Sequence, residues 1–188
     1  MSKDDDEIEL VRRTANGDAA AFRVLADAHL VKIMNFAYRM LRSRTDAEDV
    51  AQETFLRLWK DAGRFEPKAR VTTWLHRIAH NLSVDRLRGR REQPSDSLDE
   101  ERTSVEPGGL LDRKRLAIDV GRALADLPER QRAAITLVHY QGLTNIEAAS
   151  VLDVGVDALE SLLARGRRSL REKLVQHESQ EVQGEQRR

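Results

Sequence analysis

Two histidines of this 188-residue chain, His76 and His80, lie one helical turn apart, which is the spacing of a metal-ligand pair. No carboxylate follows either histidine in the pattern that a zinc protease needs. The acids Asp46, Glu48 and Asp49 instead fit the start of a helix, where carboxylates stabilise the positive end of the dipole. The chain has no cysteine, which excludes disulfides, thiolate metal sites and thiol nucleophiles. The sequence therefore predicts no catalytic residue, no metal site and no cofactor.

The chemistry that residues 64–91 favour is binding of nucleic acid. This stretch has eight basic and only two acidic side chains. Residues 72–88 predict an amphipathic helix with Arg77 and Asn81 on the face opposite its apolar side, beside the two histidines. Arginines on such a face can hold phosphates, and an asparagine can hydrogen-bond base edges. Trp74 is either part of the core or a stacking platform for an exposed base.

Residues 45–60 predict a helix with an acidic face. Thr45, followed three residues later by Glu48, fits a capping box at the start of this helix. Apolar and aromatic residues mark one side as packed, whereas Asp49 and Glu53 place like charges one turn apart on the other. The acidic face is either a solvated helix surface or a docking surface for a basic partner.

The C-terminal part of the chain contains its most specific pattern. Pro128 opens a helix that stops at Gly142. Thr144 and Glu147 form a capping box for a second, short helix, and residues 153–155 make a turn before the last helix. Two short helices around a tight turn predict a helix-turn-helix, whose last helix enters the major groove of DNA. The alternative is a plain three-helix bundle with a charged end.

Helices must position all of these residues, because apolar side chains recur at three- and four-residue spacing and no run alternates as a strand does. The sequence predicts an all-α fold of two small helical domains joined by a flexible acidic linker. The linker has seven acidic side chains and one basic, although the whole chain has 32 of each sign. We expect a domain at 1–91, the linker at 92–112, a helix-turn-helix domain at 113–174 and a disordered tail at 175–188.

The chain shows no targeting or membrane segment. No window approaches the roughly 20 apolar residues that a membrane span needs. The acidic stretch at residues 1–7 has no apolar run behind it, unlike a signal peptide. These features predict a soluble, cytoplasmic protein without a membrane span.

In their order and spacing, the segments together resemble a sigma factor of bacterial RNA polymerase, of the small extracytoplasmic-function (ECF) type of the sigma-70 family. The resemblance runs from Gly17 to Leu174. It is carried by the block Asp46–Phe55, the helix Thr73–Asn81, the segment Leu127–Arg132 and the helix-turn-helix. It implies a region 2 domain at 1–91 that binds core polymerase and the minus-ten element, and a region 4 domain at 113–174 that binds the minus-thirty-five element.

The resemblance implies three binding surfaces. Docking on core polymerase would use Asp46, Asp49, Gln52, Glu53 and Phe55. Melting and binding of the minus-ten element would use Arg64, Lys68, Arg70, Trp74, Arg77, His80, Asn81, Asp85 and Arg88. Binding of the minus-thirty-five duplex would use Asp157, Ala158, Glu160, Ser161, Arg165, Arg167, Arg168 and Arg171. The start of this last helix is acidic where the family is often basic, so DNA affinity must depend on Arg165 and the arginines beyond it.

The implied partners are core RNA polymerase, promoter DNA and an anti-sigma factor, with the chain a monomer when free. Three alternatives remain open at the level of the sequence. One is a helix-turn-helix regulator that acts without replacing a sigma factor. The second is a metal-dependent nuclease built on the two histidines and the helix acids, and the third is a degenerate sigma-like interaction module.

Overall fold

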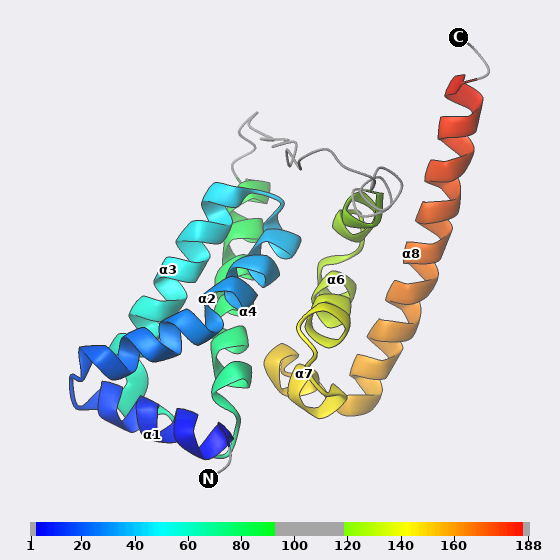
Figure 1. Ribbon diagram of the computed structural model, residues 1–188. Helices are drawn as coiled ribbons and strands as arrows, with labels where there is room; N and C mark the ends of the chain where they lie inside the picture. The colour runs from blue at the N-terminus through cyan, green and yellow to red at the C-terminus, as the bar shows by residue number, and fades with distance from the viewer. Residues whose placement is uncertain (1–2, 93–118, 186–188) are drawn as a thin grey trace.

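The structure is a computed structural model that describes residues 3–92 and 119–185, and within them the secondary structure is helical, without a strand. The all-α prediction is confirmed (Figure 1). The N-terminal half (residues 3–92) contains α1 (Lys3–Ala15), α2 (Ala19–Leu41), α3 (Arg44–Asp61), the short 3-10 helix η1 (Ala62–Arg64) and α4 (Val71–Glu92). The C-terminal half (residues 119–185) contains a helix at 119–125, α6 (Glu129–Ile135), the π-helical turn η2 (Thr136–Tyr140), α7 (Asn145–Leu152) and α8 (Val156–Glu185).

The start of α3 differs from the prediction. The helix begins at Arg44, and its cap is Ser43, whose hydroxyl accepts a hydrogen bond from the Asp46 N–H at 3.2 Å. The predicted capping box at Thr45 is therefore wrong, since Thr45 lies inside the first turn. Glu48 instead accepts a hydrogen bond from the Arg44 side chain at 3.0 Å. Serine and threonine are both good caps, so residue type alone does not choose between two candidates that lie two positions apart.

The helix-turn-helix has the caps that the sequence predicts. The Thr144 hydroxyl accepts from the Glu147 N–H at 3.2 Å, and the Glu147 carboxylate accepts from the Thr144 N–H at 2.8 Å, which completes the capping box of α7. Gly142 ends the preceding run with φ +70°, and Asp153 closes α7 in the left-handed region with φ 52°. A short polar residue such as Asp tolerates this conformation better than most.

Two element boundaries differ from the expected ones. The fourth helix, α4, continues to Glu92, the first residue of the predicted linker, and residues 93–118 lie outside the described part. The last helix, α8, continues to Glu185 through most of the predicted disordered tail at 175–188. The tail is rich in Gln and Glu and has no proline, so its residues favour a helix even without an apolar stripe to pack.

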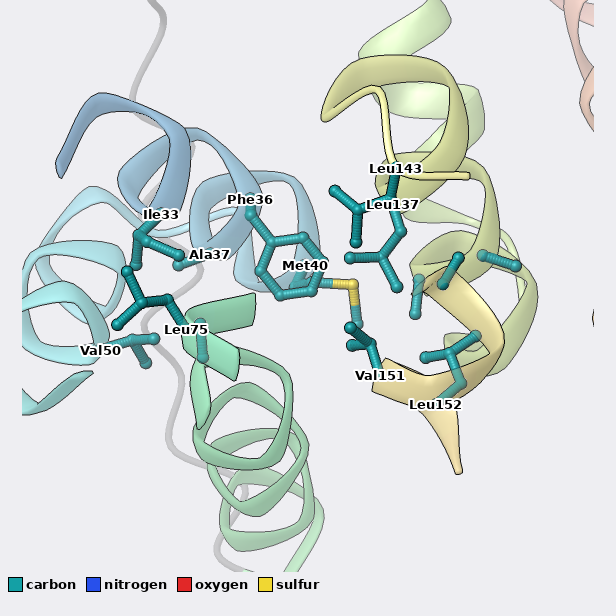
Figure 2. Packing of buried hydrophobic residues seen from close by; sticks show 14 of the residues in the cluster. Ile33, Phe36, Ala37, Met40, Val50, Leu75, Leu137, Leu143, Val151 and Leu152 are labelled. Atoms are coloured by element: carbon teal, nitrogen blue, oxygen red, sulfur yellow. The ribbon is translucent and has the colours of Figure 1, made fainter. Parts of the chain in front are cut away.

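The core of the N-terminal half is built around α2. Leu25, Ile33 and Phe36 of this helix have no exposed surface. They pack with Val50 of α3 and Leu75 of α4, which are also buried (Figure 2). This core fixes the positions of the two helices, α3 and α4, on which the predicted polymerase and minus-ten residues lie.

The two halves pack directly against each other, which the sequence does not predict. The first helix of the helix-turn-helix, α7, lies beside α4, and η2 lies beside α2 (Figure 1). Figure 2 shows Met40 at the end of α2 among Leu137, Leu143 and Val151 of the C-terminal half. One buried cluster therefore runs through both halves.

Candidate nucleic-acid interface

The acidic side of α3 is a continuous polar surface. Asp49 and Gln52 are exposed, and Glu53 is half-buried beside Arg57, which it bonds at 3.0 Å. Leu56 (43% exposed) and Trp59 (38% exposed) extend the surface with apolar area. The pattern of residues 45–60 predicted that the aromatic residue Trp59 lies on the packed side, and it did not indicate an exposed Leu56, although Leu56 follows Glu53 by one helical turn. A mixed acidic and apolar face of this kind can dock a basic, partly apolar partner.

Asp46 and Phe55 do not belong to this exposed face. Asp46 is half-buried and pairs with two arginines of α4, with Arg86 at 2.7 Å and also with Arg90. Phe55 is buried in the core at 7% exposure. Both residues hold α3 in place within the N-terminal half. The surface that remains available is centred on Asp49 and Gln52.

The predicted minus-ten residues lie along the loop before α4 and along α4 itself. Arg64 and Lys68 are the most exposed, and they pair only with the neighbouring carboxylates of Asp61 (3.2 Å) and Glu66 (2.8 Å). Such surface pairs contribute about 0–1 kcal/mol, so they are readily exchanged for phosphates. Farther along α4, three more predicted residues are exposed, namely Asn81, Asp85 and Arg88.

Trp74 connects the loop to α4. Its ring packs against Phe65 with the ring centroids 5.1 Å apart, and both residues are half-buried. Phe65 and Pro67 also line a hollow of about 370 Å³ between this loop and α1. Arg12 and Asn16 of α1 also line this hollow and supply hydrogen-bond donors. Trp74 thus braces the loop while part of its side chain stays at the surface.

The two histidines of α4 lie in apolar surroundings. His76 is fully buried, its Nδ1 donates to the Thr72 carbonyl at 2.8 Å, and its ring packs edge-on against Phe36. Its predicted place on the polar face is wrong, because α4 turns this position toward α2. Burial lowers the pKa of His76, and burial followed by the charge of Arg130 lowers the pKa of His80 to about 4. Among the described residues, no cluster of three His, Asp or Glu side chains is placed to hold a metal ion.

Two predicted minus-ten arginines are engaged by the C-terminal half. Arg70 donates to Asp4 at 3.0 Å and to Glu147 of α7 at 3.4 Å. Arg77 donates to the Ser150 carbonyl of α7 at 2.5 Å from Nη2 and at 3.2 Å from Nε. The helix α7 therefore contacts residues 64–88 at these two arginines, and both arginines remain exposed.

The predicted minus-thirty-five residues all lie on the exposed side of α8. They are Asp157, Ala158, Glu160, Ser161, Arg165, Arg167, Arg168 and Arg171. The first residues form an acidic patch, and Glu160 accepts a weak hydrogen bond from Asn145 at 3.4 Å. The arginines follow from the third turn onward, on a helix whose other side packs through Leu159, Leu162 and Leu163. This arrangement presents both base-contacting and phosphate-contacting groups to a groove.

Comparison with known proteins defines the class of this chain. Residues 25–93 match the family Sigma-70 region 2, and residues 117–170 match Sigma-70, region 4. The chain is 34% identical over 177 residues to the ECF RNA polymerase sigma factor SigE of Mycolicibacterium smegmatis, covering 90% of this chain and 68% of that protein. It is 30% identical over 178 residues to the ECF RNA polymerase sigma factor SigW of Bacillus subtilis, covering 87% of this chain and 94% of that protein. The chain belongs to the sigma-70 family of RNA polymerase sigma factors, and within it to the ECF sigma factors.

Two solved structures resemble the whole arrangement. CnrH in complex with the cytosolic domain of CnrY has a TM-score of 0.70 and 30% identity, covering 90% of this chain and 97% of that chain. The sigma factor RpoE of Bartonella quintana, in complex with the anti-sigma factor NepR, has a TM-score of 0.65 and 29% identity, covering 81% and 96%. These matches favour the sigma-factor interpretation over that of a stand-alone helix-turn-helix regulator. In the described part of the chain, no helix combines the length and apolar character that crossing a bilayer requires.

Proposed function

We propose that the N-terminal half docks this sigma factor on core polymerase and opens the minus-ten element, while the C-terminal half binds the minus-thirty-five element. The observation that carries the proposal is the match of the two halves, in this order, to sigma regions 2 and 4. We assign residues 1–91 to the first domain and 113–174 to the second, with 92–112 as the connection. The helix α4 ends at Glu92, one residue after the first limit, and α8 continues to Glu185, eleven residues after the limit at 174.

The polymerase-docking surface is the exposed side of α3. It comprises Asp49, Gln52 and Glu53, with Leu56 and Trp59 as its apolar part. The acidic residues Asp49 and Glu53 attract and orient a basic partner, while the apolar residues supply the area that is buried on docking. Asp46 and Phe55 support this surface from behind.

The minus-ten surface is the loop and α4. Arg64, Lys68 and Arg88 would hold phosphates of the non-template strand, and Asn81 would contact a base. The hollow beside Phe65 is a candidate site for a base extruded from the duplex. Extruding a base costs a few kcal/mol, which stacking and hydrogen bonds in such a site can offset.

The minus-thirty-five surface is the exposed side of α8. Glu160 can accept a hydrogen bond from a cytosine amino group, which contributes sequence preference. Arg165, Arg167, Arg168 and Arg171 would bind phosphates and provide most of the affinity. Because the helix start is acidic, we expect duplex DNA binding by the free chain to be weak.

The partners that follow are core RNA polymerase, promoter DNA and an anti-sigma factor. The last is supported by the resemblance to a sigma factor solved with its anti-sigma factor. The chain would act in the cytoplasm as a monomer until it joins polymerase. It would catalyse no reaction, because the polymerase forms the phosphodiester bonds.

The test is initiation of transcription in vitro. Core polymerase alone and core polymerase with this chain are compared on a library of genomic promoter fragments, with transcript starts mapped by sequencing. We expect starts at positions that share two sequence elements, and co-elution of the chain with core polymerase in gel filtration. Absence of both the starts and the co-elution would contradict the proposal.

A further inference from the structure

The helix-turn-helix is acidic up to the middle of its last helix. From residue 133 to residue 164 the chain has four acidic side chains and no Lys or Arg. The four acids are Glu147, Asp153, Asp157 and Glu160. DNA phosphates repel a carboxylate that faces them, so an acid on a DNA-binding surface lowers affinity. Each of these acids therefore needs a structural role or a role in recognition.

Three of the four acids stabilise the fold. Glu147 completes the capping box of α7 with Thr144, and Asp153 closes the same helix in the left-handed region. Asp157 lies in the first turn of α8, where a carboxylate stabilises the positive end of the helix dipole. Glu160 lies beyond this first turn, and its side chain is exposed. In the described part of the chain Glu160 has no salt-bridge partner, so the fold does not account for its charge.

Asn145 holds the Glu160 carboxylate from the neighbouring helix. Its Nδ2 donates to Glu160 Oε1 at 3.4 Å. Asn145 is the first residue of α7, so the capping box fixes its backbone. The turn in turn fixes α8 against α7, because the Val154 N–H donates to the Ala149 carbonyl at 3.1 Å. The long bond from a fixed amide orients the glutamate, which otherwise has many rotamers, and leaves Oε2 available as an acceptor.

Glu160 lies on the same side of α8 as two of its exposed arginines. Arg167 and Arg171 follow it by seven and eleven residues, which is roughly two and three turns of a helix. At 1.5 Å per residue they lie about 10 and 16 Å farther along the helix axis. The early residues of a recognition helix meet base edges, while groups farther along hold the phosphates. With these arginines on the backbone, Glu160 faces the base edges of the major groove.

The chemistry of a carboxylate selects among the four bases. On their major-groove edges only cytosine and adenine offer an amino group, whereas guanine and thymine present acceptors that a carboxylate repels. Adenine also has an acceptor, N7, beside its amino group, and cytosine has none on this edge. An acceptor-only side chain such as Glu160 therefore favours cytosine.

We propose that Asn145 is a positioning residue, which holds the Glu160 carboxylate toward the amino group of one cytosine in the minus-thirty-five element. This proposal rests on the proposed assignment of α8 to duplex DNA. It makes the first helix of the helix-turn-helix a determinant of promoter choice through a residue that does not itself contact a base.

The test is selection from a pool of random duplex DNA by the full chain alone and by its complex with core polymerase. Low salt strengthens phosphate contacts, so the free chain also retains DNA for sequencing. We expect one position of the selected motif to favour cytosine about tenfold, in the lower part of the range for a good base contact. Glu160→Ala should bind the pool more tightly and lose this preference, because it removes both the repulsion and the acceptor. A variant that keeps cytosine would overturn the proposal, and so would a parent motif without such a position.

Glu160→Gln should change the preference rather than remove it. Glutamine keeps the length of the side chain and hydrogen-bonds N6 and N7 of adenine. The same position of the motif should therefore change from cytosine to adenine. Continued selection of cytosine by Glu160→Gln would place this side chain away from the base edges and overturn the proposal.

Asn145→Asp tests the positioning role. It keeps the shape of the side chain, removes the donor and places a like charge beside Glu160. The fold tolerates it, because an acid in the first turn of α7 is favoured by the helix dipole. We expect the cytosine preference to fall to about threefold or less, since a released glutamate samples several rotamers. Asn145→Gln, which retains an amide donor, should keep most of the preference.

Ile146→Asp is the matched control. It adds the same charge at the next position, where the side chain is 73% exposed. It should lower affinity for the whole pool as Asn145→Asp does, and leave the cytosine preference unchanged. A purely structural contact between Asn145 and Glu160 predicts the opposite for Asn145→Asp: a lower free energy of unfolding in urea, weaker binding of every sequence and an unchanged preference. That outcome would overturn the proposal.

These results are distinguishable from those of the transcription assay. A chain that selects cytosine through Glu160 and Asn145, but neither binds core polymerase nor starts transcription, would support the role of Asn145 and contradict the sigma function. Promoter-specific initiation with a motif that Asn145→Asp and Glu160→Gln leave unchanged would support the sigma function and overturn the role of Asn145.

Discussion

Two neighbouring acids of α3 have different structural positions, and this predicts different mutant effects. Asp46 is half-buried against Arg86 and Arg90, whereas Asp49 is exposed and touches Arg86 at 3.2 Å only from the surface. Asp46→Asn should lower the free energy of unfolding by about 1–2 kcal/mol, because a charged hydrogen-bond network is lost. Asp49→Lys should leave unfolding within about 0.5 kcal/mol and weaken binding to core polymerase about tenfold.

Urea unfolding and a core-binding titration separate the two effects. Asp49→Asn is the control for charge removal without reversal, and it should weaken binding less than Asp49→Lys. Equal losses of core affinity for Asp46→Asn and Asp49→Lys at equal stability would contradict the separation of a supporting acid from a docking acid.

The histidines of α4 predict a pH dependence of stability. The folded pKa of His80 is about 4, below the value of about 6.5 expected in the unfolded chain, so the unfolded state binds more protons between these values. Stability should therefore fall as the pH drops from about 6.5 to about 4, and the lowered pKa of His76 acts in the same direction. Thermal unfolding across this range should show a smaller decline for His80→Gln than for the parent chain. An equal decline in both would show that His80 does not contribute.

At the scale of elements, the sequence predicted the helix ends that depend on residues close together in the chain. The capping box of Thr144 and Glu147 and the left-handed Asp153 were predictable because each depends on residues only a few positions apart. Ser43 and Thr45 lie two residues apart and are caps of similar strength, so their residue types did not decide which of them caps α3. The burial of His76 was not predictable, because the neighbour that covers its ring, Phe36, is forty residues away in the sequence.

The same scale gives a prediction for α8. Its exposed arginines begin at Arg165, after an acidic start, so they should carry the phosphate contacts of the helix. Replacing Arg165 and Arg168 by Ala should reduce the salt slope of holoenzyme binding to duplex minus-thirty-five DNA by about 1.8, at about 0.9 per lost contact. Core binding should be unchanged, and Arg23→Ala on α2 serves as the control for loss of an exposed arginine elsewhere. An unchanged salt slope would remove these two arginines from the interface.

At the scale of the whole molecule, the pairing of the halves is the feature that the sequence did not indicate. Each half has its own helical pattern, and the acidic connection between them suggested independent domains. The sequence pattern of the N-terminal half alone already accounts for the residues at the interface. Met40 ends an apolar stripe of α2, and Arg77 is a predicted phosphate ligand. Only their juxtaposition with α7 and η2 shows the second role.

The shared core predicts cooperative unfolding of the two halves, which the positions of the tryptophans make measurable. Trp59 and Trp74 both lie in the N-terminal half, so tryptophan fluorescence follows that half alone, whereas far-UV circular dichroism follows the helices of both. In urea, the two signals of the parent chain should give one coincident transition, as expected when neither half is stable without the other. Tyr140→Lys should separate the two transitions, because it weakens the interface and leaves each half intact. Separate transitions in the parent chain would mean that the packing of Met40 against the C-terminal half contributes too little to couple them.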